Sequence, residues 1–427
     1  MKKVLIICYY WPPAGGPGVQ RWLKFVKYLR DFDIEPVVYV PENPHYPIED
    51  SSLEKEIPNG IEIIKTPIFE PYGFAKLFSK ESTRQISSGI IKPEGKQSFL
   101  QKLMLFVRGN LFIPDARKWW VKPSIKFLAS YLDKNPVDII ITTGPPHSLH
   151  LIGLALKVQK DLSWLADFRD PWTTIGYQKK LKLTDWATKK NANLEFEVLN
   201  KADHILVTSP TTQSDFEKTT STPISCITNG FDDEIVPETS LDTAFTLAHI
   251  GSLLEDRNPE ILWEVLQELV TELPHFSKDL KIELTGRVGA SVVDSIKEKG
   301  LETNLSLPGY VNHTEALQKQ HSAQLLLLIE IDSQETEAII PGKLFEYLAS
   351  RRPILAIGPK HSDIASILKK SESGIYFNYQ QKQGLKKHIK FNYELFKNTG
   401  ISSTSGNVDA YSRKNLTRDL ARLIHSI

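Results

Sequence analysis

Residues 4–31 read VLIICYYWPPAGGPGVQRWLKFVKYLRD, and this stretch decides the class of fold. An apolar run at Val4–Cys8 enters a loop rich in glycine and proline at residues 12–18, and Val19–Asp31 then shows the spacing of an amphipathic helix. A strand that is apolar at consecutive positions is buried on both faces of its sheet, which is typical of parallel α/β proteins. The run is too short for a signal peptide and lacks a small-residue cleavage site, so we interpret it as the first β-strand.

Short apolar runs alternate with helical segments along the rest of the chain. This pattern predicts seven strands up to residue 228 and six more from residue 246 onward. The acidic segment Asp232–Thr243 has little to bury and separates the two series. We therefore expect an α/β protein with two Rossmann-like, doubly wound parallel-sheet domains, residues 1–238 and 239–406, facing each other across a ligand-binding cleft. A last helix within residues 407–427 is expected to pack back toward the N-terminal domain.

The composition excludes several classes of protein. At 427 residues the chain is too long for one ordinary core, which agrees with two or three domains. The net charge is +1, so no strong field favours nucleic acid. Only Cys8 and Cys226 are present, too few for a disulfide framework or a zinc site, and no apolar run reaches the ~18 residues of a membrane-spanning helix. These features indicate a cytoplasmic protein.

The loop after the first strand contains Gly15 and Gly16 and precedes a helix. Glycines at such a position let a phosphate or an acceptor approach backbone N–H groups at the helix N-terminus. A dinucleotide fingerprint would need a glycine at position 21, which is Arg21, so a nicotinamide or flavin cofactor is disfavoured. An ordinary glycine-rich turn explains the loop equally well.

Two further strand ends of the first half carry polar residues. In Thr142–Ser148 (TTGPPHS), His147 lies at the start of a helix, where it and Ser148 have the alternative role of helix caps. In Trp164–Trp172 (WLADFRDPW), Asp167, Arg169 and Asp170 gather two carboxylates and a guanidinium at the mouth of a parallel strand. A catalytic cluster and an ion-paired structural cluster both remain possible there. Asp31 and Asp33 match a D-x-D metal motif but lie at the opposite end of their helix, so we assign them to a surface turn.

The second half offers candidates for holding a diphosphate and a ribose. Gly251 follows the first strand of this half, and Arg257 follows six residues later, where its guanidinium can bind phosphate beside a helix N-terminus. Lys343 and Glu346 are three residues apart near the start of another helix and hence share a face. The carboxylate of Glu346 can accept two hydrogen bonds from ribose hydroxyls. A solvated arginine and a surface ion pair are the alternatives.

Taken together, the motifs resemble glycosyltransferase family 4, retaining enzymes of the GT-B fold, over nearly the whole chain, in a bacterial subgroup that has DFRDPW and PGKLFEYLA. The residues that carry the resemblance are Tyr10–Arg21 (YWPPAGGPGVQR), Gly144–Ser148 (GPPHS), Asp167–Trp172 (DFRDPW), Asn229–Asp232 (NGFD), Gly251–Pro259 (GSLLEDRNP) and Pro341–Ala349 (PGKLFEYLA).

The resemblance implies roles for individual residues. Glu346 matches the second glutamate of the E-x7-E motif, which binds the nucleotide ribose, and Arg257 falls where the family has a diphosphate-binding lysine. Three positions depart from the family: Ala338 replaces the first glutamate, Ser252 replaces an arginine after the glycine, and Arg169 aligns with a histidine. Ala338 puts the identity of the donor sugar in question. Ser252 leaves Arg257 as the cation expected at the diphosphate. Arg169 changes the electrostatics around DFRDPW.

The implied activity is transfer of a sugar, with retention, from a nucleotide-sugar donor to an acceptor hydroxyl of a glycan or lipid-linked acceptor in cell-surface polysaccharide or glycan synthesis. The enzyme would be hexosyltransferase-like and metal-independent, with no cofactor and no nucleic-acid partner. The expected catalytic residues are Asp167, Arg169, Asp170 and His147; the expected donor-binding residues are Gly15, Gly16, Gly251, Arg257, Lys343 and Glu346. A GT-B isomerase or phosphorylase, or a catalytically silent sugar-nucleotide-binding scaffold, is the alternative.

Residues 76–126 differ from the rest of the chain in charge. They hold eleven basic and three acidic residues, a net charge of +8, and include the apolar stretch Phe99–Ile113. Such a segment can dock on anionic lipid, which predicts reversible attachment to the inner face of the cytoplasmic membrane. The alternative is that Leu103, Phe106 and Val107 pack into the first domain while the lysines are merely solvated.

Overall fold

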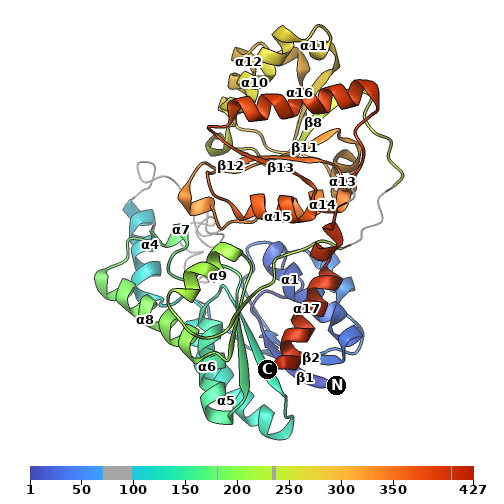
Figure 1. The fold of residues 1–427 in the computed structure, drawn as a ribbon. Coiled ribbons are helices and arrows are strands. Elements are labelled where there is room, and N and C mark those ends of the chain that lie inside the picture. Colours follow the sequence, from blue (N-terminus) through green and yellow to red (C-terminus); the bar gives the residue numbers. More distant parts are fainter. Residues whose placement is uncertain (71–98, 180, 233–236, 405) are drawn as a thin grey trace. The chain divides into compact units, whose positions relative to one another are not determined.

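The structure is a computed structural model that describes residues 1–70, 99–179, 181–232, 237–404 and 406–427. Its contacts divide the chain into two compact units (Figure 1): Met1–Thr228 together with Arg413–Ile427, and Asn229–Ser412. The chain therefore leaves the first unit after Thr228, somewhat before the boundary expected at residue 238, and re-enters it for the last helix. Each unit is built on a parallel sheet, so both have the α/β class that the sequence predicts.

The sheet of the first unit has seven strands in the order β3-β2-β1-β4-β5-β6-β7. Every pairing in it is parallel. The strands are β1 (Lys2–Ile7), β2 (Ile34–Pro41), β3 (Glu62–Thr66), β4 (Ile139–Gly144), β5 (Ser163–Phe168), β6 (His204–Val207) and β7 (Ile224–Cys226). The order reverses direction between β1 and β4, which is the place where a doubly wound sheet opens a crevice at its carboxyl edge.

Alternate residues of β1 pack against different layers of helices. Val4 and Ile6 belong to a buried cluster with apolar residues of helices α1 and α17, whereas Leu5 and Ile7 pack with residues of α5, α6 and α8. This two-sided burial explains why the strand is apolar at every position. The helices of this unit are α1 (Pro17–Leu29), α4 (Phe99–Leu111), α5 (Lys118–Lys134), α6 (Ser148–Lys160), α7 (Gly176–Lys179), α8 (Asp185–Lys201), α9 (Pro210–Glu217) and α17 (Arg413–Ser426).

The sheet of the second unit has six parallel strands in the order β10-β9-β8-β11-β12-β13. The strands are β8 (Phe245–Ile250), β9 (Leu280–Thr285), β10 (Leu305–Gly309), β11 (Leu325–Ile329), β12 (Ile354–Gly358) and β13 (Gly374–Asn378). The helices are α10 (Glu260–Glu272), α11 (Phe276–Asp279), α12 (Ala290–Glu298), α13 (His313–Ser322), α14 (Gly342–Ser350), α15 (Asp363–Ser371) and α16 (Lys382–Asn398). Here the order reverses between β8 and β11.

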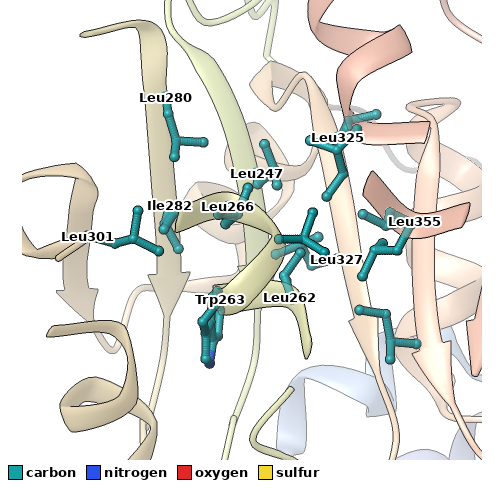
Figure 2. Close-up of a cluster of buried hydrophobic side chains, with 14 of the residues drawn as sticks. Leu247, Leu262, Trp263, Leu266, Leu280, Ile282, Leu301, Leu325, Leu327 and Leu355 are labelled. Carbon is teal, nitrogen blue, oxygen red and sulfur yellow. The ribbon is translucent and has the colours of Figure 1, made fainter. Parts of the chain in front are cut away.

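The second unit buries its apolar side chains on both faces of the sheet. On one face, Leu247 and Leu327 of the central strands meet Leu262, Trp263 and Leu266 of α10 (Figure 2). On the other face, Ala248 and Ile250 of β8 pack against α14 and α15. Figure 1 shows α10, α12 and α16 on one side of this sheet and α14 and α15 on the other. The alternation of period two along β8 thus sends neighbouring residues into two separate cores.

Two local expectations can be compared with the structure directly. Asp31 and Asp33 are exposed in the turn between α1 and β2, where Asp33 adopts a left-handed φ of 60° and Asp31 pairs with Lys414 at 3.2 Å. The prediction of a surface turn at this D-x-D sequence is therefore confirmed. Among the described residues, no helix is both long and apolar enough to cross a membrane.

The C-terminal helix α17 lies beside α1 in the first unit (Figure 1). Leu416, Leu420 and Ile424 are buried in the same cluster as Trp22 and Val26 of α1. Arg413, at the start of α17, donates a hydrogen bond from Nη2 to Oε1 of Gln20 at 2.5 Å. Apolar residues of α17 therefore pack into the same core as those of β1 and α1.

We predict that Leu420→Ala lowers the stability of the first unit. Leu420 is fully buried between α17 and α1, so truncating it leaves a cavity that costs roughly 2–5 kcal/mol. Leu423→Ala, on the same helix but only partly buried, serves as the control and should cost clearly less. Urea unfolding followed by tryptophan fluorescence measures both, and an equal loss for the two variants would contradict the packing of α17 described here.

Candidate functional site

The first unit gathers its polar candidates at the carboxyl edge of the central strands. The loop from β1 to α1 contains Gly15 and Gly16, the loop from β4 to α6 contains His147, and β5 ends at Phe168, just before Arg169. Since β1, β4 and β5 are neighbours, these loops meet at the reversal point of the sheet. Gly16 has a φ of 92°, a conformation that favours glycine, and precedes the first turn of α1. Beside the Cα of Gly16 a side chain would enter open space, so the backbone there is accessible.

Asp167 lies at the centre of a buried ion-paired cluster. Its carboxylate accepts hydrogen bonds from Nη2 of Arg21 at 3.0 Å, from Nε1 of Trp22 at 2.7 Å and from the hydroxyl of Thr143 at 2.8 Å. The side chains of Asp167 and Arg21 are essentially inaccessible to solvent. Arg21 also donates to the carbonyl oxygen of Thr228 at 3.0 Å.

This geometry favours one of the two roles considered for Asp167. The ion-paired structural alternative describes it better than contact with a substrate, because its carboxylate is fully buried and its oxygens already accept four hydrogen bonds, counting the long one from Nε of Arg21. Its ion-pair partner is Arg21 rather than the neighbouring Arg169. The sequence did not single out Arg21 as a candidate site residue. It showed only that Arg21 occupies the position where a dinucleotide-binding fingerprint has its third glycine.

Arg169 ties together the loops at this edge through backbone carbonyls. Nη1 donates to the carbonyl of Gly18 at 2.7 Å, Nε donates weakly to the carbonyl of Gly144 at 3.4 Å, and Nη2 donates to the carbonyl of Pro145. Its guanidinium also lies 5.7 Å from the ring centre of Tyr10. Because carbonyl oxygens do not neutralise its charge, the half-buried guanidinium still offers a positive charge beside the glycine loop.

His147 is held as a neutral ring in an aromatic environment. It stacks on Trp172 with ring centres 5.0 Å apart and planes inclined by 6°, and burial lowers its pKa well below the ordinary value. Both ring nitrogens are buried, and neither makes a hydrogen bond to a residue that the structure describes. The capping role considered for His147 and Ser148 is wrong, because the carboxylate of Asp115 accepts from both the backbone N–H and the hydroxyl of Ser148 at 2.9 Å.

Asp170 is the carboxylate of this edge that the surrounding residues leave available. Within the described part of the chain it makes no hydrogen bond or ion pair, and burial raises its pKa despite the opposing charge of Arg169. Glu195 holds the residues that follow Asp170 by accepting hydrogen bonds from the backbone N–H groups of Trp172 at 3.0 Å and of Thr173 at 3.2 Å. Asp170 is therefore held in place by its neighbours while its own oxygens remain without a partner among the described residues.

In the second unit, three candidate donor-binding residues converge at the end of β8. Gly251 has a φ of 126° and follows β8, and a Cβ placed on it would lie 2.8 Å from Nζ of Lys343. Lys343 is the second residue of α14, and its amine also contacts Nε2 of His249 at 3.2 Å. Burial and the nearby Arg257 lower the pKa of Lys343 to about 8. The backbone of Gly251, which carries no side chain, and the mostly buried amine of Lys343 thus lie next to each other.

Arg257 joins this cluster through Glu330, which follows β11. Nη2 of Arg257 lies 3.4 Å from Oε2 of Glu330, and Nε of Arg257 is buried without a hydrogen bond to any described residue. The carboxylate of Glu330 is almost fully buried, and burial raises its pKa. Arg257 therefore pairs with Glu330, whereas Glu330 and Glu346 act on Lys343 only through their charges and form no ion pair with it among the described residues. The sequence did not single out Glu330 because nothing around it marks a motif.

Glu346 lies one turn along α14 from Lys343 and is exposed. Its carboxylate accepts a hydrogen bond from Nε2 of Gln320 on α13 at 3.2 Å. Gln320 is itself buried, and its amide oxygen makes no hydrogen bond within the described residues. The i,i+3 surface ion pair considered for Lys343 and Glu346 is not present, since the amine of Lys343 bonds to His249 instead. One carboxylate oxygen of Glu346 remains open to solvent.

The structure therefore brings the predicted residues together in two groups. Gly251, Arg257, Lys343 and Glu346 gather at the carboxyl edge of the second sheet, while Gly15, Gly16, His147, Arg169 and Asp170 gather at that of the first. In the described part of the chain, no group of three or more His, Cys, Asp or Glu side chains is placed so that it could hold a metal ion. The roles assigned to these residues from the sequence stay predictions.

We predict that Asp167→Asn strongly destabilises the protein, whereas Asp170→Asn does not. Removing the carboxylate charge leaves the guanidinium of Arg21 buried and unpaired, which costs roughly 3–5 kcal/mol. Asp170 has no such partner among the described residues and serves as the matched control three positions away. Thermal unfolding of both variants tests this, and similar melting temperatures for the two would contradict a structural role for Asp167.

Comparisons with known proteins match the whole chain to solved structures but not to a sequence family. No protein-family model matches the chain, and no curated protein sequence matches it. A sucrose-phosphate synthase from Thermosynechococcus elongatus is 14% identical with a TM-score of 0.59, covering 100% of this chain and 99% of that one. The lipopolysaccharide outer core galactosyltransferase WaaB is 13% identical with a TM-score of 0.59, covering 100% and 99%.

A third similar structure is HepE from Anabaena, solved in complex with UDP-glucose. It is 14% identical with a TM-score of 0.57, and the match covers all of both chains. Identities this low show the fold alone. With its two parallel, Rossmann-like sheets of seven and six strands, the chain has the fold of the GT-B glycosyltransferases.

Proposed function

We propose that this protein is a retaining glycosyltransferase of family 4 that transfers a sugar from a nucleotide-sugar donor to an acceptor hydroxyl in cell-surface glycan synthesis. The observation that carries the proposal is the convergence of Gly251, Lys343 and Arg257 at the reversal point of the second sheet. Of the three similar structures, one is a galactosyltransferase, one is a complex with UDP-glucose, and the third is a sucrose-phosphate synthase.

The charge at this edge matches what the reaction needs. Breaking the bond between sugar and diphosphate develops negative charge on the departing nucleoside diphosphate, and positive groups placed there in advance stabilise the transition state. Arg257 pairs with Glu330 at 3.4 Å, whereas Lys343 has no ion pair among the described residues, so a diphosphate would give Lys343 a direct anionic partner. Because Lys343 is mostly buried, its interaction with an anion would be weakly screened by solvent. Glu346 lies beside them with an open carboxylate oxygen for the ribose hydroxyls.

The first unit would supply the acceptor side. The open backbone at Gly16 and the charge of Arg169 suit a polar or anionic group near the start of α1. Asp170, which has no hydrogen-bond partner among the described residues, is the group there suited to accept a hydrogen bond from an acceptor hydroxyl, whereas both nitrogens of His147 are buried. We infer that leaving-group stabilisation is the main catalytic contribution and that the reaction uses no metal, with the departing diphosphate taking up the acceptor proton.

A catalytically silent sugar-nucleotide-binding subunit is the second candidate. It is favoured by Ala338, which stands where family members have the glutamate that holds the donor sugar. The two candidates share the nucleotide site and differ in turnover. Binding of a donor without release of nucleoside diphosphate in the presence of membrane-derived acceptors would support the silent subunit; release of free nucleoside diphosphate only when acceptor is added would support the transferase and argue against an isomerase.

We predict that Arg257→Ala and Glu346→Gln weaken binding of UDP while the fold is preserved. Losing a hydrogen bond to a charged group costs about 1.5–3 kcal/mol, which corresponds to a loss of roughly tenfold to over a hundredfold in affinity. Lys390→Met, an exposed lysine on α16, is the control and should bind UDP as the wild type does. Calorimetry with UDP and 2′-deoxy-UDP separates the roles, because only Glu346→Gln should reduce the preference for the ribose. Wild-type affinity in both variants would refute this site.

We also propose that the first unit docks reversibly on anionic membrane through the start of α5 and its neighbours. Of the residues that the alternative packs into the domain, Leu103 and Phe106 are 48% and 43% exposed and Val107 is half-buried, whereas the neighbouring Leu105 is buried. Trp119 and Phe127 are 43% and 42% exposed on one face of α5, interleaved with Lys122 and Lys126.

The aromatic residues near Trp119 form a small connected surface. Phe69 and Phe112 contact the Trp119 ring edge-on, with ring centres 5.5 Å and 5.2 Å away, and the amine of Lys118 lies over both Phe112 and Trp119. Exposed aromatic rings beside lysines suit the interface of an anionic bilayer, where each lysine near the surface adds about 1 kcal/mol. Of the basic segment 76–126 predicted to bind membrane, residues 76–98 lie outside the described part of the chain.

We predict that Trp119→Ser combined with Lys122→Glu abolishes sedimentation with anionic liposomes. The change removes one exposed ring and reverses one charge of the same helix face. Phe391→Ser, which removes an exposed ring from α16 in the second unit, is the control. Wild-type protein should sediment with anionic liposomes at low salt and much less at high salt or with neutral liposomes. Equal sedimentation of the wild type and the double variant would contradict the proposed surface.

A further inference from the structure

His249 is a buried histidine of the second unit whose two nitrogens have different partners. It lies on β8 with no exposed surface, and its Nδ1 is 2.9 Å from the carbonyl oxygen of Leu327 on the neighbouring strand β11. A carbonyl oxygen only accepts hydrogen bonds, so Nδ1 carries the proton. Burial and the charge of Lys343 lower the pKa of His249 to about 3, although backbone hydrogen bonds with Leu327 and Ser252 act in the opposite direction, so the ring is neutral. Because Nδ1 carries the proton, Nε2 is the nitrogen that can accept from Lys343.

The acceptor nitrogen faces the amine of Lys343 at 3.2 Å. This contact, together with the bare Cα of Gly251, determines where the end of a long and otherwise flexible side chain lies. Lys343 forms no ion pair with a carboxylate within the described residues, and its hydrogen-bond partner is uncharged. The amine is therefore oriented without its charge being neutralised, which is what an anion-binding group needs.

We propose that His249 is a positioning residue that holds the ammonium group of Lys343 over Gly251 for contact with the donor diphosphate. This inference rests on the proposed function, because it takes the diphosphate site as given. It adds the residue that orients the second cation of that site. The hydrogen bond from Nδ1 to the carbonyl oxygen of Leu327 holds the ring of His249 in one orientation. The ring in turn holds the amine of Lys343 in place through Nε2.

The charged groups around Lys343 determine the pH dependence that follows. They are His249 on β8, Arg257 before α10, Glu330 after β11 and Glu346 on α14 itself. Only the ammonium form of Lys343 attracts a diphosphate, and its pKa is about 8, so UDP affinity should fall as the pH rises through this value. An acceptor bonded to the ammonium favours the charged form, so losing Nε2 should move this fall to lower pH.

The test is a double-mutant cycle of His249→Asn and Lys343→Met, with UDP affinity measured by calorimetry. An asparagine amide can still donate to the carbonyl of Leu327 but does not reach Lys343, so the strand contact is preserved while the acceptor is lost. We expect His249→Asn to weaken UDP binding about tenfold in the wild-type background and less than twofold in the Lys343→Met background. His249→Gln, which keeps an acceptor near the position of Nε2, should retain most of the affinity.

A second readout does not depend on any nucleotide. Reductive methylation with ¹³C-formaldehyde labels Lys343, whose NMR signal is identified by its absence from Lys343→Met, and the signal should titrate at lower pH in His249→Asn than in the wild type. If the wild type binds no nucleoside diphosphate but this titration shifts as expected, the proposed function fails while the positioning of Lys343 stands. An equal loss of affinity in both backgrounds, or an unchanged Lys343 titration, overturns the role of His249.

His388 provides the matched control for this experiment. It is another partly buried histidine with a lowered pKa, but it lies on α16 and bonds to Asn392 of the same helix. His388→Asn should leave both UDP affinity and the Lys343 titration unchanged. Melting temperatures of all variants are compared at the same pH, and a His249→Asn variant as stable as His388→Asn with weakened binding supports positioning rather than a general loss of structure.

Discussion

The buried pair of Arg21 and Asp167 is the interaction on which the candidate site of the first unit depends. It joins α1 to the end of β5, and through Thr143 and Thr228 it reaches β4 and the point where the chain leaves the unit. Placing both charges in the interior is costly, and their attraction compensates only when the geometry is close and the remaining oxygens are bonded. The hydrogen bond from Trp22 helps to meet that condition. The glycine loop and the residues after β5 are thereby held on one rigid frame.

The two units handle charge at their carboxyl edges in opposite ways. In the first unit, Asp167 and Arg21 satisfy each other, and Arg169 is bonded to carbonyl oxygens. In the second unit, Arg257 pairs with Glu330, and the direct partner of Lys343 is a neutral ring. A buried cation without an anionic partner carries a desolvation penalty, which a bound anion relieves. This is the physical reason for the diphosphate contact that we propose for Lys343.

Much of the fold and part of the site were predictable from the sequence. Consecutive apolar residues such as Val4–Cys8 marked the strands, and the helical segments between them were found at nearly the observed bounds, because burial on both sheet faces leaves a strong pattern. The prediction also placed Gly251, Arg257, Lys343 and Glu346 at strand or helix ends. It left two roles open for Asp167, whose carboxylate is fully buried, because a motif shows that a charge exists but not which charge it faces.

The sequence by itself determined the α/β class, the two series of strands and the positions of the chemically active side chains along the chain. Only the tertiary structure decided the strand order, and with it which loops meet: β1 beside β4, and β8 beside β11. It also decided that Asp167 pairs with Arg21, 146 residues away, and that His249 orients Lys343 across 94 residues. The pattern of residues along a short segment indicates its burial and its backbone conformation. Contacts between residues far apart in the sequence arise only when their segments pack side by side.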